Sequence, residues 1–63
     1  MEVNEKIKQY LEEHGISQAF VIRVTGIHRN RVGRIVNGKA KLTAAELGLI
    51  AKALNVSADI FLK

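Results

Sequence analysis

The chain has 63 residues, 48% of them hydrophobic, and a formal net charge of +4. This length allows one domain with one small core, and the absence of cysteine excludes disulfides and thiolate metal sites. No apolar run approaches the ~20 residues that a membrane-spanning helix needs, and the first ten residues lack the apolar segment of a signal peptide. We therefore expect a single domain over residues 1–63, located in the cytoplasm.

The first predicted helix spans residues 3–14, because apolar side chains recur along it at spacings of three and four. These side chains are Val3, Ile7, Tyr10 and Leu11. Gly15 follows as a stop. Lys6 and Lys8 lie outside the apolar stripe, where contact with solvent is favoured over contact with phosphate.

A second short helix is predicted over residues 18–24, with Ser17 as its N-cap and with Val21 and Val24 on its apolar face. Phe20 broadens this face, and we expect it in the core against the first or the fourth helix. The helix ends at a tight break, since Gly26 can adopt the positive φ that other residues resist.

The third predicted helix spans residues 28–36, with Val32, Ile35 and Val36 at inward spacing. Asn37-Gly38 favours a left-handed turn at its end. Two short helices joined by a brief turn that contains glycine form a helix-turn-helix. The outer face of the third helix carries an excess of hydrogen-bond donors: His28, Arg29, Asn30, Arg31 and Arg34. A helix that only covers a core does not need them, whereas a helix that enters the DNA major groove needs long donors in its first turn.

Thr43 and Glu46 have the spacing of a capping box, which predicts a fourth helix ending at Asn55. Its apolar stripe consists of Leu47, Ile50, Ala51 and Leu54. Ser57 is expected to cap a last short helix that includes residues 59–62. The predicted fold class is all-α, a compact bundle of five short helices with a helix-turn-helix at the second and third.

The basic residues are concentrated on the helix-turn-helix. All six acidic residues lie outside residues 14–45, whereas six of the ten lysines and arginines lie inside this window. Such asymmetry indicates a polyanionic partner. The alternative is a solvated basic face, and the helix-turn-helix favours the first interpretation.

The stretch 17–39 resembles the phage repressor and Cro-type helix-turn-helix domains, also called the lambda-repressor-like or XRE family. The residues that carry the resemblance are Gln18, Gly26, Ile27, Val32, Ile35, Asn37, Gly38 and Lys39. It continues over residues 43–54. It implies a phage or bacterial transcriptional repressor or regulator in the bacterial cytoplasm or nucleoid, which binds a double-stranded DNA operator as a homodimer. Two residues depart from the family pattern: Ile22 stands where alanine is usual, and Gly33 lies inside the third helix. Close approach of the Gly33 backbone to DNA or to another helix is one explanation, and a weakly ordered recognition helix that becomes ordered on binding is the alternative.

Base readout is assigned to four residues of the third helix: His28, Arg29, Asn30 and Arg34. Arginine can fork onto O6 and N7 of guanine, and asparagine onto N6 and N7 of adenine. Contacts with DNA phosphate are expected from Ser17, Gln18, Arg31, Asn37, Gly38, Lys39 and Lys41. For Gln18 and residues 37–41 this role is implied by the resemblance.

The sequence contains few residues in patterns that an enzyme active site would need. No pattern of histidines and carboxylates has metal-ligand spacing, and His14 near Ser17 is better explained as a helix end followed by a cap than as a base and a nucleophile. We expect no catalysis, no cofactor and no metal. The rival function is a protein-interaction or antitoxin-type module. A dimer surface is expected near residues 56–62, although Phe61 and Leu62 can also pack on their own core.

Overall fold

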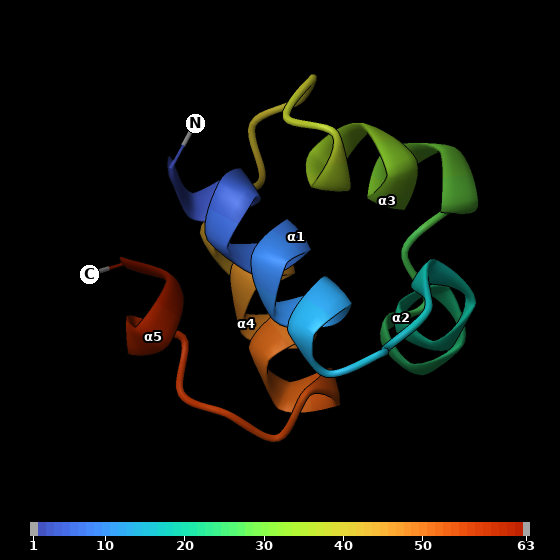
Figure 1. Ribbon diagram of the computed structural model, residues 1–63. Coiled ribbons are helices and arrows are strands. Elements are labelled where there is room, and N and C mark those ends of the chain that lie inside the picture. The colour runs from blue at the N-terminus through green and yellow to red at the C-terminus, as the bar shows by residue number, and fades with distance from the viewer. Residues whose placement is uncertain (1, 63) are drawn as a thin grey trace.

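The computed structural model describes residues 2–62, which form five α-helices (Figure 1). Their bounds are α1 Glu2–Glu13, α2 Gln18–Thr25, α3 Arg29–Val36, α4 Ala44–Ala53 and α5 Asp59–Leu62. The predicted all-α class is confirmed. Each predicted helix is present, and the bounds differ from the prediction by at most two residues.

Local capping explains where two of the helices start. The Ser17 hydroxyl accepts a hydrogen bond from the Phe20 N–H at 3.2 Å, as an N-cap should. At α4 the Thr43 hydroxyl accepts from the Glu46 N–H at 3.1 Å, and the Glu46 carboxylate accepts from the Thr43 N–H at 2.8 Å. The predicted capping box is thereby confirmed.

Glycines in the left-handed backbone conformation end α2 and α3. Gly26 has φ 76° and donates its N–H to the Ile22 carbonyl, which closes α2. Gly38 has φ 74°, and the Lys39 N–H reaches back to the Arg34 carbonyl at 2.8 Å. This pair of features is a Schellman motif, and it turns the chain sharply away from α3. Both predicted glycine turns are confirmed.

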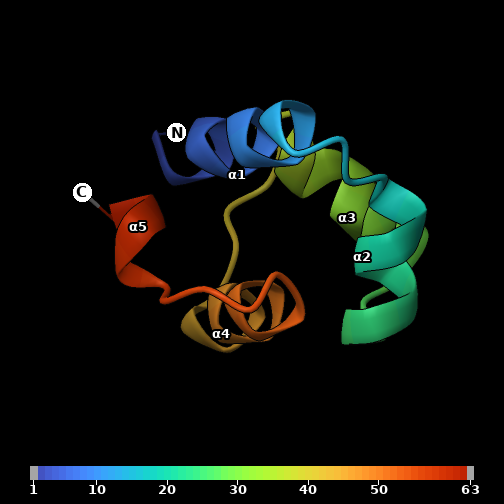
Figure 2. The same ribbon diagram turned by 60° about the horizontal axis from the view of Figure 1, so that its bottom comes forward.

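The core lies where α1 and α4 face each other, with α2 and α3 on one side and α5 on the other (Figure 2). The buried apolar residues come from all five helices and from the end of α4: Ile7, Leu11, Val21, Val32, Ile35, Val36, Ile50, Ala51, Leu54 and Phe61. Such a core leaves the far side of α3 uncovered. Within residues 2–62, no helix has the length and apolarity needed to cross a membrane.

Two apolar residues of α2 do not lie where the sequence predicts. Val21 is buried, but Val24 is 51% exposed and Phe20 lies outside the core cluster. The ring of Phe20 instead has the Arg23 guanidinium 5.9 Å from its centroid. A helix of two turns can direct only one narrow stripe at the core, and Val21 occupies it together with the partly buried Ile22. The predicted core role of Phe20 is therefore wrong, as is the inward placement of Val24.

Ile22 and Gly33, the two residues that depart from the family pattern, have different surroundings in the structure. Ile22 is partly buried and packs against the core. Gly33 faces the start of α2, and a Cβ built on it would lie 3.8 Å from Gln18 Oε1, an ordinary van der Waals distance. Close approach to another helix therefore does not require glycine at position 33, because the space there admits a methyl group.

Gly48 gives a test of helix propensity without a packing effect. It lies inside α4, and a Cβ added there meets nothing within 4 Å. Because glycine costs about 1 kcal/mol relative to alanine in a helix interior, Gly48→Ala is expected to raise the urea midpoint. For a domain of this size that free energy corresponds to roughly 4–8 °C in melting temperature. A lower midpoint in the variant would contradict the expectation.

Candidate nucleic-acid interface

The helix α3 begins one residue later than predicted. His28 is its N-cap, and the His28 Nδ1 atom accepts a hydrogen bond from the Asn30 N–H at 3.1 Å. His28 is exposed, so its Nε2 edge is not enclosed by the core. The bond explains why a histidine precedes the helix, and a contact of the same ring with DNA stays a prediction.

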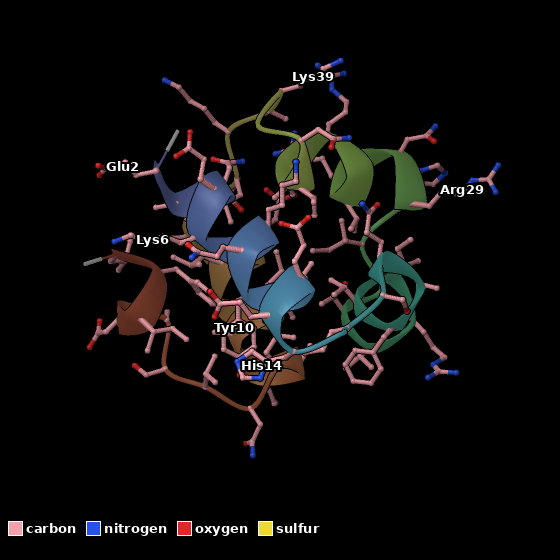
Figure 3. All side chains as sticks on the ribbon, in the orientation of Figure 1. Glu2, Lys6, Tyr10, His14, Arg29 and Lys39 are labelled. Carbon is pink, nitrogen blue, oxygen red and sulfur yellow. The ribbon has the colours of Figure 1, made fainter. Side chains whose placement is uncertain are left out.

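The two faces of α3 differ completely in character. Val32, Ile35 and Val36 are buried, whereas Arg29, Asn30 and Arg34 are exposed. Arg29 points away from the body of the protein (Figure 3). The first turn contains no acidic residue, although acids suit the positive end of a helix dipole and arginine does not. Helix stability therefore does not explain the arginine at the start of α3.

Arg31 has a different place from the other arginines of α3. Its Nε and Nη2 atoms donate to the two carboxylate oxygens of Glu46, both at 2.8 Å, and Nη2 also donates to the Lys41 carbonyl at 2.6 Å. The fork ties α3 to the first turn of α4. The sequence pattern assigned Arg31 to phosphate. In the structure, two of its nitrogens are already engaged within the protein.

The ion pair changes the titration of Glu46. The Arg31 guanidinium, and then the Thr43 backbone N–H, lower the pKa of the Glu46 carboxyl from 4.5 to about 2. The side chain of Glu46 is 18% exposed, so water screens the pair only in part. One carboxylate thus caps α4 and also holds α3. Local spacing revealed the cap, but nothing in the sequence revealed the ion pair.

Apart from Arg31, the residues predicted to contact phosphate lie at the start of α2 and in the turn after α3. Ser17, Gln18, Asn37, Gly38, Lys39 and Lys41 are all exposed. Gln18 and Asn37 line one shallow depression together, although one belongs to α2 and the other to the turn after α3. Lys39 and Arg29 lie at opposite ends of α3 (Figure 3). The surface therefore has the base-reading candidates Arg29 and Asn30 in the first turn of α3 and Arg34 in its last turn, with backbone-contacting candidates in the turn that follows.

Lys8 joins this surface from α1. It lines the depression that contains Gln18 and Asn37, and it lines a second depression with Asn37 and Gly38. The sequence favoured a solvated Lys8, because spacing along α1 shows only that the residue faces away from the core. Lys6, two residues earlier, instead lines a depression with Tyr10 and Phe61 on the side of α5.

The residues that a hydrolase would need serve other purposes. The His14 ring stacks on Tyr10 with the ring centroids 4.1 Å apart, and the Ser17 hydroxyl caps α2. Among the described residues 2–62, no group of three histidine, aspartate or glutamate side chains could hold a metal ion.

Comparisons with known proteins identify the family. Residues 7–61 match the model of the helix-turn-helix family HTH_3. The chain is also similar to the control protein C.SmaI of Serratia marcescens, with 30% identity over 53 residues, covering 84% of this chain and 63% of that protein. The match thus spans less than two thirds of the length of this relative. No solved structure matches the chain significantly. The chain belongs to the XRE-type helix-turn-helix family.

Proposed function

We propose that the protein binds double-stranded DNA sequence-specifically through α3 and thereby acts as a transcriptional repressor or regulator in the cytoplasm or nucleoid of a bacterium. The observation that carries this proposal is the polar outer face of α3. Its first turn presents Arg29 and Asn30, and Arg34 follows one turn later, all exposed. The arginines supply the forked donors, and the asparagine amide the donor and acceptor pair, that major-groove base edges select. His28 stands at the entry of the same helix.

Phosphate contacts from two segments support this docking. The exposed residues Ser17 and Gln18 lie at the start of α2, where helix N–H groups favour an anion. Asn37, Gly38, Lys39 and Lys41 follow the C-terminal end of α3, where Asn37 shares a shallow depression with Gln18. We assign Arg31 to holding α3 on Glu46 rather than to phosphate. Contacts of this kind set the register of the protein on DNA without reading its sequence.

A homodimer fits this mode of binding. The recognition helix has 8 residues and reaches only a few base pairs, so two copies on half-sites ~34 Å apart would double the readout. Ile60 and Leu62 of α5 are 43% and 59% exposed, whereas Phe61 between them is 1% exposed. We therefore assign Ile60 and Leu62 to the dimer contact and Phe61 to the core of its own subunit.

The rival function is a protein-interaction module in which DNA contact is secondary. A protein-binding outer face of α3 would be expected to be apolar, since the centre of such interfaces is depleted of charged residues. The outer face of α3 carries Arg29 and Arg34 instead. DNA binding is therefore the better supported function.

In vitro selection from random duplex DNA, followed by fluorescence anisotropy on the selected sequence across a salt series, tests the proposal. We expect a palindromic sequence and a log–log salt slope of about −5 to −9, for ~6–10 phosphates on a dimer. Weak binding without sequence preference would contradict sequence-specific recognition. No binding at low salt would favour the protein-interaction module.

Lys8→Ala tests the contribution of α1 to phosphate binding. We expect it to weaken operator and random DNA in equal proportion and to reduce the salt slope by about 1 for each phosphate that Lys8 neutralises. Lys6→Ala is the matched control, because it removes the same charge from the same helix on the side of α5. Equally weakened binding in the two variants would show that only net charge matters.

A further inference from the structure

A buried asparagine connects α1 to both ends of the turn after α3. Asn4 has no exposed surface. Its Nδ2 atom donates to the Ile35 carbonyl at 2.8 Å and to the Ala40 carbonyl at 2.9 Å. These acceptors are 31 and 36 residues away in the sequence. One amide group thus bridges the last turn of α3 and the end of the segment that follows it.

An asparagine at position 4 costs stability, and the two hydrogen bonds of its amide group offset that cost. Within the described residues, the Asn4 Oδ1 atom is buried without a hydrogen-bond partner, and such an atom opposes folding. Leucine has a similar size and would avoid this cost. However, leucine would leave the two carbonyl groups without the donor that Asn4 supplies. The pair of carbonyl contacts is therefore the structural reason for an amide at this position.

The segment 37–41 is held at several points by other bonds. At its start, the Gly38 N–H donates to the Ile35 carbonyl at 3.1 Å and the Lys39 N–H to the Arg34 carbonyl at 2.8 Å. At its end, Arg31 donates to the Lys41 carbonyl, next to the Ala40 carbonyl that Asn4 holds. Asn4 adds a hydrogen bond from α1 to the Ala40 carbonyl of this segment and another to the Ile35 carbonyl in the last turn of α3.

We propose that Asn4 is a positioning residue for DNA binding, which keeps segment 37–41 in the conformation that meets the phosphate backbone. The proposal rests on the proposed function. Without the amide, the segment would be less ordered, and holding it against DNA would cost conformational entropy, so part of its phosphate contacts would be lost. Because phosphate contacts carry no sequence information, the weakening falls equally on operator and random DNA. The ratio of the two affinities stays unchanged.

The test compares Asn4→Leu with Phe61→Leu, a core substitution on α5. Hydrogen exchange of the Gly38 and Lys39 amides is measured in the free protein, and the Kd for operator and random DNA is measured across a salt series. For Asn4→Leu we expect faster exchange at these amides and a shallower salt slope. We also expect a Kd about tenfold higher on both DNAs, equivalent to ~1.4 kcal/mol. Phe61→Leu should lower global stability but leave the slope unchanged. If Asn4→Leu does not fold, the same measurements are made on Asn4→Ser, which keeps one hydroxyl donor.

Three results would overturn the proposal. The first is unchanged exchange at Gly38 and Lys39 in the Asn4 variant. The second is a change in the ratio of operator to random affinity. The third is an equal reduction of affinity and slope in Phe61→Leu, which would assign the effect to stability alone. Failure of the proposed function looks different, because the unsubstituted protein would then lack selective DNA binding while the exchange experiment would still report on the Asn4 hydrogen bonds.

Discussion

Arg29→Ala is expected to remove discrimination at one base-pair position of each half-site. Arg29 is exposed in the first turn of α3 and points away from the body of the protein. A bidentate contact from arginine to guanine contributes roughly 1–3 kcal/mol of discrimination, which is about 5- to 150-fold in relative affinity. The measurement is competition anisotropy against operators that carry each of the four bases at every position. Binding to random DNA should change much less than binding to the operator.

Lys39→Ala is the control for this experiment. Lys39 is exposed in the turn at the opposite end of α3, and we assign it to phosphate. Its removal should weaken all sequences alike and lower the salt slope by about 1 for each phosphate that Lys39 neutralises. If Arg29→Ala instead lowers operator and random affinity by the same factor, as Lys39→Ala should, the base-reading role of Arg29 is wrong.

Glu46→Gln is expected to lower the urea midpoint of unfolding at neutral pH and to lower the melting temperature by several degrees. Glutamine keeps an oxygen that can accept from the Thr43 N–H, so the capping box is largely retained. The substitution removes the charge that the Arg31 guanidinium contacts through both carboxylate oxygens. It therefore isolates the bond between α3 and α4 from the cap. The measurement is urea unfolding of both proteins over a range of pH.

The pH dependence of this difference has a defined sign. Folding depresses the pKa of Glu46 from 4.5 to about 2. The ionised carboxylate thus stabilises the fold fully above pH 4.5, and this contribution is lost as the pH falls through 2. The gap between wild type and Glu46→Gln should narrow over this window. Glu12→Gln, an exposed carboxylate on α1, is the control. A gap of constant size across the window would show that charge is not the cause.

Helix starts and stops were predicted well because their signals are local. Ser17 bonds to the N–H three residues later, and the capping box at Thr43 closes over the same distance. Gly38 adopts the left-handed conformation that its residue type permits. Each of these interactions lies within a few residues, so the amino-acid order alone contains both partners.

Burial at the edges of the core was predicted less well. Val24 and Phe20 are as apolar as Val21, but only Val21 lies in the direction of the core. Phe61 and Leu62 were left with two possible roles, and only the packing of α5 on α1 separates them: the Phe61 ring lies against Tyr10, with centroids 5.8 Å apart. Composition cannot decide between neighbouring apolar residues, because a short helix directs only a narrow stripe inward.

The sequence by itself determined the five helices, the caps at Ser17 and Thr43, the helix-turn-helix and the polar outer face of α3. These features follow from residue type and from spacings of three and four, which hold in any context that keeps the helices. Only the tertiary structure decided which groups hold α3 and its following turn in place. Arg31 meets Glu46 from 15 residues away, and Asn4 meets Ile35 and Ala40 from 31 and 36 residues away. Such contacts depend on how the helices pack, and no local spacing in the sequence encodes them.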